Sequence, residues 1–274
     1  SWLGRNAGLV AAIAYMAIPY HLVDVYVRAA MAESVALVFL PLALWGFREA
    51  TLRPRLTAIT GAAVVYAAIM WTSNLVALIF TPGLAAYVLA LLMGEARGEG
   101  RNVRRLPVSI LRRGAWPLIA ALLGLGLSAA FFVPALIEQR YVNQTQWFGK
   151  YYDPFQHFVY FFQLFDPSWG FGISQPGPND AALGAMSYQL GAAAALLSLI
   201  ALVLIRRHEP DRRYEIGFWA GWLIVSVFLA LNAAAWVWRA IPLVRYAQFP
   251  WRYLMLAIIP LSILPGTLVS RWRR

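Results

Sequence analysis

The sequence contains no cysteine, which excludes disulfides and thiolate metal sites. Its three histidines, His21, His157 and His208, are too widely spaced to form a local metal-binding motif. No glycine-rich phosphate loop is present, so a nucleotide site of that kind is not expected. Charged residues make up 13% of the chain, about half the share of a typical soluble domain. This scarcity of charge argues against an ordinary soluble fold.

Apolar residues make up 61% of the 274 residues, against roughly 45–50% in soluble domains. They occur in long blocks, and a helix needs about 20 mostly apolar residues to cross a bilayer. The eight blocks cover roughly residues 7–21, 34–47, 56–71, 74–93, 116–137, 186–205, 216–235 and 253–269. We therefore predict an all-α, polytopic bundle of about eight transmembrane helices.

We expect residues 1–274 to form a single transmembrane domain. The chain begins with Ser1 rather than methionine and shows no signal-peptide pattern. It is therefore expected to be a fragment of a longer protein, with membrane helices missing before Ser1. Only Lys150 is a lysine among the 23 basic residues, and together with the abundant alanine, glycine and arginine this favours a bacterial source.

The basic residues indicate how the helices are oriented. With both ends of the chain inside and eight crossings, 17 of the 23 basic residues lie in cytoplasmic segments, as the positive-inside rule requires. This explains the net charge of +11, so nucleic acid is not an expected partner. The six basic residues left outside are Arg28, Arg140, Lys150, Arg239, Arg245 and Arg252. Topology does not explain them, which makes them candidates for function.

A large extracytoplasmic loop is predicted over residues 138–185. Asp153-Pro154 is typical of a helix start, and Asp166-Pro167 of a stop. Between them the phenylalanines fall on one helical stripe, which predicts an amphipathic helix lying in the outer interface. Such a helix either only anchors the loop or forms a wall or lid for a site.

The first candidate site lies between the first two apolar blocks. If this stretch is helical, Asp24 and Arg28 share a face because they are four residues apart. Glu33 lies near the start of the next block, and ionisable groups at that depth usually face a protein interior or a water-filled cavity. The residues form either an ion pair that ties the loop to the bundle or the polar floor of an outward-facing cavity.

The other candidates lie in two further outer segments. Asn74 occupies a short turn, where asparagine also occurs for backbone reasons alone. Arg245, Gln248 and Arg252 precede the last block, together with Arg239. Arginine makes bidentate contacts with phosphate oxygens, so a phosphate headgroup would suit this segment. The alternative is interfacial packing with arginines that reach lipid headgroups.

Three stretches carry a family resemblance, namely Tyr20 to Glu33, Ser73-Asn74-Leu75, and Gln248 to Leu254. They resemble a bacterial family of large membrane proteins with a 6-pyruvoyl-tetrahydropterin synthase-related membrane domain. That family is similar in architecture to the GT-C superfamily of membrane glycosyltransferases. The histidines of the soluble synthase have no counterpart here, so no pterin chemistry is implied. Ser73 stands where the family often has histidine.

The resemblance implies transfer of a sugar from a polyprenyl-phosphate donor to a glycan or protein acceptor. The reaction would take place on the outer face of the bacterial cytoplasmic membrane, in the cell envelope. Arg245 and Arg252 would then hold the donor phosphate, and Asp24, Arg28 and Glu33 would line the cavity. The key acid of GT-C enzymes is expected upstream of Ser1, with Asp24 and Glu33 as the candidates within this chain.

Gln248 and Asn74 are further candidates for substrate binding. The sequence predicts no metal-ligating residues. A divalent cation is the one cofactor that stays open. Two functions from other classes of membrane protein stay open. One is a transporter or flippase of a lipid-linked or anionic solute, and the other is a non-catalytic membrane scaffold.

Overall fold

A computed structural model describes residues 4–98, 106–141, 149–175, 177–178, 180–208 and 213–271. These residues are predominantly helical, and their β-structure is one isolated bridge between Val159 and Leu231. The chain divides into two compact units. Unit 1 comprises residues 1–31 and 144–274, and unit 2 comprises residues 32–143.

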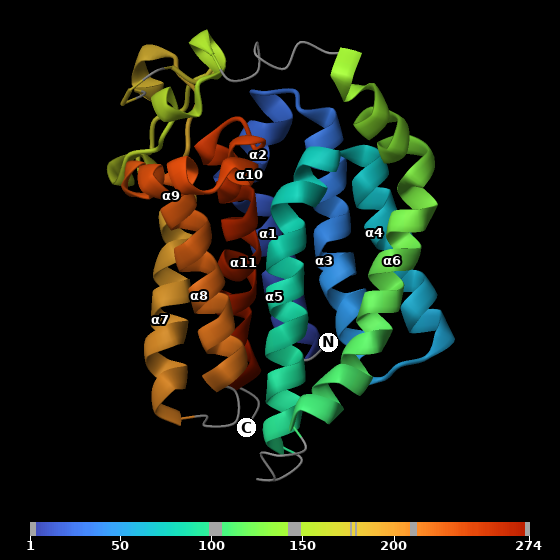
Figure 1. The fold of residues 1–274 in the computed structure, drawn as a ribbon. Coiled ribbons are helices and arrows are strands. Elements are labelled where there is room, and N and C mark those ends of the chain that lie inside the picture. The colour runs from blue at the N-terminus through green and yellow to red at the C-terminus, as the bar shows by residue number, and fades with distance from the viewer. Residues whose placement is uncertain are drawn as a thin grey trace. The chain divides into compact units, whose positions relative to one another are not determined.

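Unit 2 contains four long helices, coloured from blue to green in Figure 1. They are α3 (Met31–Leu52, of which Met31 belongs to unit 1), α4 (Leu56–Thr72), α5 (Asn74–Gly98) and α6 (Leu106–Glu138). The short helix η2 (Gln139–Tyr141) follows α6. The Tyr66 hydroxyl lies 2.8 Å from Thr81 Oγ1 and so links α4 to α5.

Helices α4 and α6 pack closely because α6 presents small residues to α4. Ala120, Gly124 and Ser128 follow one another at four-residue spacing, and all three are buried. A Cβ on Gly124 would lie 2.7 Å from the Ala63 carbonyl oxygen. Small residues let membrane helices approach in this way, while the leucines on the other faces of α6 are exposed, as lipid contact requires.

Unit 1 is built around α11 (Leu254–Arg271), which packs against α1 (Arg5–Ala17), α7 (Ala192–His208) and α8 (Arg213–Ala230). Pro260 interrupts the hydrogen bonding of α11, because proline cannot donate to the carbonyl four residues earlier. That carbonyl belongs to Leu256, and it accepts a 3.0 Å hydrogen bond from the Trp222 indole of α8. A side chain of the neighbouring helix therefore satisfies the backbone group that the proline leaves open.

Each of the eight predicted apolar blocks contains a helix, although the first residues of the sixth block, 186–191, precede α7. Segments in four of these helices are long and apolar enough to cross a membrane: Met31–Leu52, Asn74–Glu95, Leu111–Glu138 and Pro250–Val269. α1 and α2 (Pro19–Tyr26) make a fifth candidate as one span bent by 46°. The helices of blocks three, six and seven are apolar but shorter. The part of the chain that the structure describes therefore has four to five candidate spans, and eight crossings stay a prediction.

The predicted amphipathic helix between Asp153 and Asp166 is wrong. Two short 3-10 helices, η5 (Pro154–Gln156) and η6 (Phe161–Leu164), form there instead. Between them the chain is extended, because the Val159 N–H donates to the Ala230 carbonyl at the end of α8. The phenylalanine stripe is therefore split, with Phe158 5% exposed and Phe162 58% exposed. The predicted start is confirmed, since the Asp153 carboxylate accepts from the Phe155 N–H at 3.0 Å.

Further short helices complete unit 1. They are η4 (Lys150–Tyr152), η7 (Ala181–Leu183), η9 (Asn232–Ala234), α9 (Ala235–Ala240), α10 (Pro242–Arg245) and η10 (Pro250–Tyr253). Figure 1 shows α9 and α10 at the same end of the unit 1 helices as the loop that carries η4 to η7. The predicted outer segments of this unit thus gather at one end.

Candidate functional site

The end of α2 holds an ion pair between Asp24 and Arg28. Pro19 starts the helix at a position where no N–H is needed. At the other end the Arg28 N–H donates to the Val23 carbonyl at 3.0 Å, and Ala29 adopts a positive φ of 48°. Arg28 Nη1 donates to Asp24 Oδ1, and the two side chains are only 12% and 3% exposed. The predicted i,i+4 contact is confirmed, and both charges are largely shielded from solvent.

Trp251 brings two arginines together from distant parts of the sequence. The guanidinium carbon of Arg28 lies 4.4 Å from the centre of its ring, and that of Arg252 lies 5.6 Å from it. Both distances suit a cation–π contact. Phe249 stacks on Trp251 at 5.1 Å with an interplanar angle of 12°. The aromatic pair thus forms a platform for the two cations.

Gln248 fixes the position of Arg252. Arg252 Nη1 donates to Gln248 Oε1 at 2.8 Å and to the Ala247 carbonyl at 3.0 Å. Gln248 has a φ of 63°, a conformation that costs energy for any residue other than glycine. Such a backbone conformation persists only where contacts with the surrounding residues hold it in place. We call Asp24, Arg28, Gln248, Trp251 and Arg252 the Trp251 cluster.

The Trp251 cluster is rich in hydrogen-bond donors and positive charge. It contains two guanidinium groups and one carboxylate. The Trp251 side chain is buried, and its indole N–H has no hydrogen-bond partner among the residues that the structure describes. A buried N–H without a partner carries a desolvation cost. An anionic acceptor would match this donor and the two guanidinium groups beside it.

Arg245 lies in a different group from Arg252. The guanidinium carbons of Arg245 and Arg239 lie 5.6 Å and 5.3 Å from the centre of the Phe155 ring. Arg245 Nε also donates to the Trp238 carbonyl at 2.9 Å. The structure therefore places Arg245 and Arg252, both predicted to hold one phosphate, on two different aromatic rings.

Glu33 and Asn74 belong to unit 2, whereas the residues of the Trp251 cluster belong to unit 1. Glu33 is buried in the first turn of α3, where a carboxylate interacts favourably with the helix dipole. Asn74 is the first residue of α5 and is exposed, while the Ser73 hydroxyl accepts from the Val76 N–H at 3.3 Å. Ser73 thus caps the helix, a backbone role that the sequence indicated only for Asn74.

A buried histidine connects the loop of unit 1 to the aromatic platform. His157 Nδ1 lies 2.9 Å from Ser174 Oγ, and Nε2 bonds the Tyr151 carbonyl. Phe249 meets the His157 ring edge-on at 5.0 Å. Burial lowers the pKa of His157 below 6.5, opposed by the hydrogen bond to Tyr151 and by the charge of Asp153. Local sequence patterns give no signal for this contact, because Phe249 is distant from His157 along the chain.

The same loop has a cavity of about 420 Å³ lined by Gln175, Pro178, Asp180, Leu183, Gly184 and Ala185. The Asp180 carboxylate accepts from the Ala182 N–H at 2.9 Å, and Asp166 accepts from the Ser168 N–H at the same distance. Both carboxylates therefore stabilise turns. No group of three potential metal-ligating side chains occurs within the described ranges.

Comparison with known proteins gives no match to this chain, whether among family models, curated proteins or solved structures.

Proposed function

We propose that this chain is a glycosyltransferase-like integral membrane protein that uses a polyprenyl-phosphate sugar. In this proposal the Trp251 cluster binds the donor phosphate on the outer face of a bacterial cytoplasmic membrane. The acceptor is a glycan or a protein, and the eight crossings of a GT-C-like bundle provide the membrane scaffold. The observation that carries the proposal is the meeting of Arg28 and Arg252 on Trp251.

Arginine suits this role because its planar guanidinium group offers paired donors to phosphate oxygens. Negative charge builds up on the phosphate as the sugar leaves, and preorganised donors stabilise this charge best when water is excluded. The low exposure of the Arg28 side chain fits that requirement. The Trp251 N–H supplies a further donor that is already desolvated.

Asp24 is assigned a positioning role. Because Arg28 donates to Asp24, the carboxylate holds the guanidinium in place against Trp251. The proposal therefore assigns the Trp251 cluster to donor recognition and not to proton transfer.

The test uses the whole chain in lipid nanodiscs. Wild-type protein should bind undecaprenyl phosphate, and undecaprenol, which lacks the phosphate, should bind at least about tenfold more weakly, since a charge-assisted contact contributes about 1.5–3 kcal/mol. The variants Arg28→Gln and Arg252→Gln should each bind undecaprenyl phosphate more weakly than the wild type by a similar factor. Arg140→Gln is the matched control, because Arg140 lies exposed over Tyr141 outside the cluster. Equal binding of the alcohol and the phosphate would overturn the proposal.

Transfer is tested separately with a radiolabelled polyprenyl-phosphate hexose. Alanine at Arg28 or Arg252 should abolish transfer in the full-length protein without loss of membrane insertion. Normal transfer by both variants would contradict the assignment.

A transporter or flippase is the second candidate, and the break between α1 and α2 favours it. Discontinuous membrane helices commonly form the binding sites of transporters, and here a 46° bend precedes Asp24 and Arg28. Labelled lipid phosphate in sealed vesicles separates the two functions. Movement across the bilayer with the sugar still attached supports transport, whereas loss of the sugar supports transfer.

A further inference from the structure

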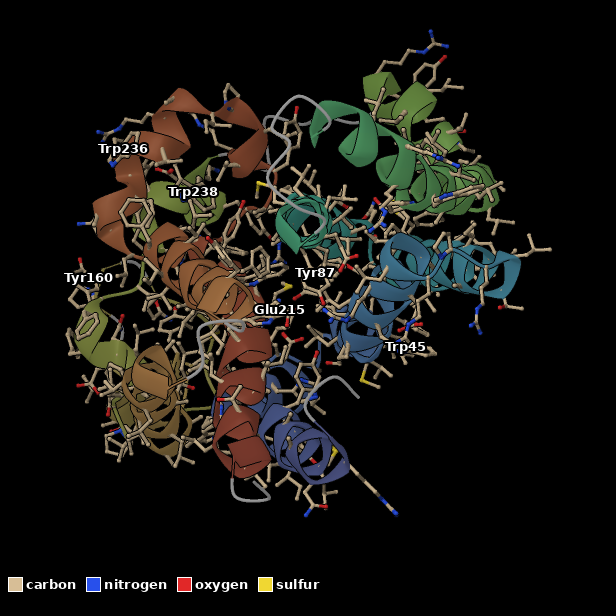
Figure 2. All side chains as sticks on the ribbon, turned by 90° about the horizontal axis from the view of Figure 1, so that it is seen from below. Trp45, Tyr87, Tyr160, Glu215, Trp236 and Trp238 are labelled. Carbon is tan, nitrogen blue, oxygen red and sulfur yellow. The ribbon has the colours of Figure 1, made fainter. Side chains whose placement is uncertain are left out.

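The segment between α8 and the start of the last candidate span has an exposed apolar surface. We call residues 235–246, which include α9 and α10, the interfacial segment. Trp236 is 64% exposed whereas Trp238 is fully buried, and Figure 2 shows them on the outer and inner sides of α9. Ile241, Leu243 and Tyr246 are also exposed. So many large apolar side chains on one short segment indicate contact with another surface.

The interfacial segment also carries two positive charges. Arg239 and Arg245 both lie against the ring of Phe155. Neither arginine is paired with a carboxylate within the residues that the structure describes. The Phe155 ring and the Trp238 carbonyl fix the two guanidinium groups beside the exposed apolar side chains. A partner for this surface must therefore combine negative charge with apolar material.

The position of the interfacial segment along the chain indicates that its partner is the membrane. The last candidate span begins at Pro250, four residues after Tyr246, and four residues reach at most about 14 Å. The end of α10 is thus held close to one boundary of the bilayer. α9 has six residues and α10 has four, which is too short for either to cross. A segment of this kind fits a position along the membrane surface.

We propose that the interfacial segment binds anionic lipid headgroups in the leaflet that it faces. Arg239 and Arg245 contact the headgroup phosphates, and Trp236, Leu243 and their exposed neighbours enter the boundary of the acyl chains. Tryptophan and arginine are both suited to this layer, since each combines an apolar body with a polar tip. The inference is independent of the donor site, because it uses neither Arg28 nor Arg252.

The absence of cysteine allows a local measurement of lipid contact. Leu243→Cys is labelled with the fluorophore NBD, and the protein is placed in phosphatidylcholine vesicles that contain equal mole fractions of nitroxide-labelled phosphatidylglycerol or nitroxide-labelled phosphatidylcholine. We expect shallow nitroxides to quench the label more than deep ones. We also expect local enrichment of phosphatidylglycerol by about fivefold per arginine, from about 1 kcal/mol each.

Three double variants of the labelled Leu243→Cys protein test the proposal. Arg239→Gln with Arg245→Gln should remove the excess quenching by phosphatidylglycerol. Arg239→Lys with Arg245→Lys should retain the excess quenching, because the positive charge is kept. Arg53→Gln with Arg55→Gln is the matched control at two exposed arginines, and it should leave the excess unchanged. Quenching of the label by aqueous iodide but not by lipid nitroxides would overturn the proposal, as would an excess that survives the double glutamine variant.

Discussion

The guanidinium carbon of Arg28 lies 4.4 Å from the centre of the Trp251 ring, although the two residues come from opposite ends of the described chain. This contact joins α2 to the start of the last candidate span. It also places the Asp24–Arg28 pair beside Arg252, so that one aromatic side chain organises all the charged groups of the cluster.

The first prediction concerns the charge balance of this pair. Arg28→Met removes an ion-pair partner of a carboxylate that is 3% exposed, and should lower the free energy of unfolding by about 3 kcal/mol. Asp24→Asn combined with Arg28→Met removes both charges and should recover most of this loss. Unfolding by denaturant titration in detergent micelles measures both effects. If the double variant is no more stable than Arg28→Met, the pair does not act as a unit.

The second prediction concerns the glycine that lies against Pro19. Gly191 has a φ of 87°, and a Cβ there would lie 3.0 Å from Pro19 Cδ. Gly191→Ala should therefore add backbone strain, shift α2 and weaken phosphate binding at the Trp251 cluster. Gly184→Ala is the matched control, because Gly184 has a φ of 97° and its Cβ would meet no atom within 4 Å.

Both glycine variants should lose about 1–2 kcal/mol of stability from the positive φ. Only Gly191→Ala should lower the affinity for undecaprenyl phosphate. Equal binding by the two variants would show that the contact with Pro19 has no part in positioning Arg28.

The third prediction tests the packing of unit 2. Gly124→Ala places a methyl group 2.7 Å from the Ala63 carbonyl oxygen, so α4 and α6 must move apart at a cost of about 1–3 kcal/mol. Gly126→Ala, two residues along the same helix, meets no atom within 4 Å and should leave stability nearly unchanged. Thermal unfolding in detergent compares them, and a smaller loss for Gly124→Ala than for Gly126→Ala would contradict the close approach.

The fourth prediction concerns pH. Burial lowers the pKa of His157 below its ordinary value of 6.5, so the unfolded loop takes up a proton at a higher pH than the folded loop. Stability of the loop should therefore be full above about pH 6.5 and should fall as the pH drops from there toward the lower folded pKa. Hydrogen exchange of residues 149–175 as a function of pH measures this loss.

His157→Gln provides the control for the pH experiment. Glutamine can still form hydrogen bonds but does not titrate, so the protection of the loop relative to unfolded-chain exchange should not change over the same range. An unchanged pH profile in this variant would assign the effect to another group.

Local sequence patterns predicted the parts of the structure that depend on local interactions. The apolar blocks became helices, and the four-residue spacing of Asp24 and Arg28 became an ion pair. The amphipathic helix failed because the Val159 N–H bonds to the end of α8, a partner distant in sequence. Contacts between residues that are distant in sequence also determine the site. The spacing of residues cannot predict that Arg28 packs against Trp251 or that Arg245 packs against Phe155.

The bend at Pro19 has a mechanical consequence. α2 has eight residues, so it is a lever arm of about 12 Å with Arg28 just beyond its tip. Straightening the 46° bend would move that tip sideways by about 9 Å, given the helix rise per residue. This displacement is about twice the distance that separates Arg28 from the Trp251 ring. A small rotation at one proline thus suffices to make or break the contact between the two arginine-bearing segments.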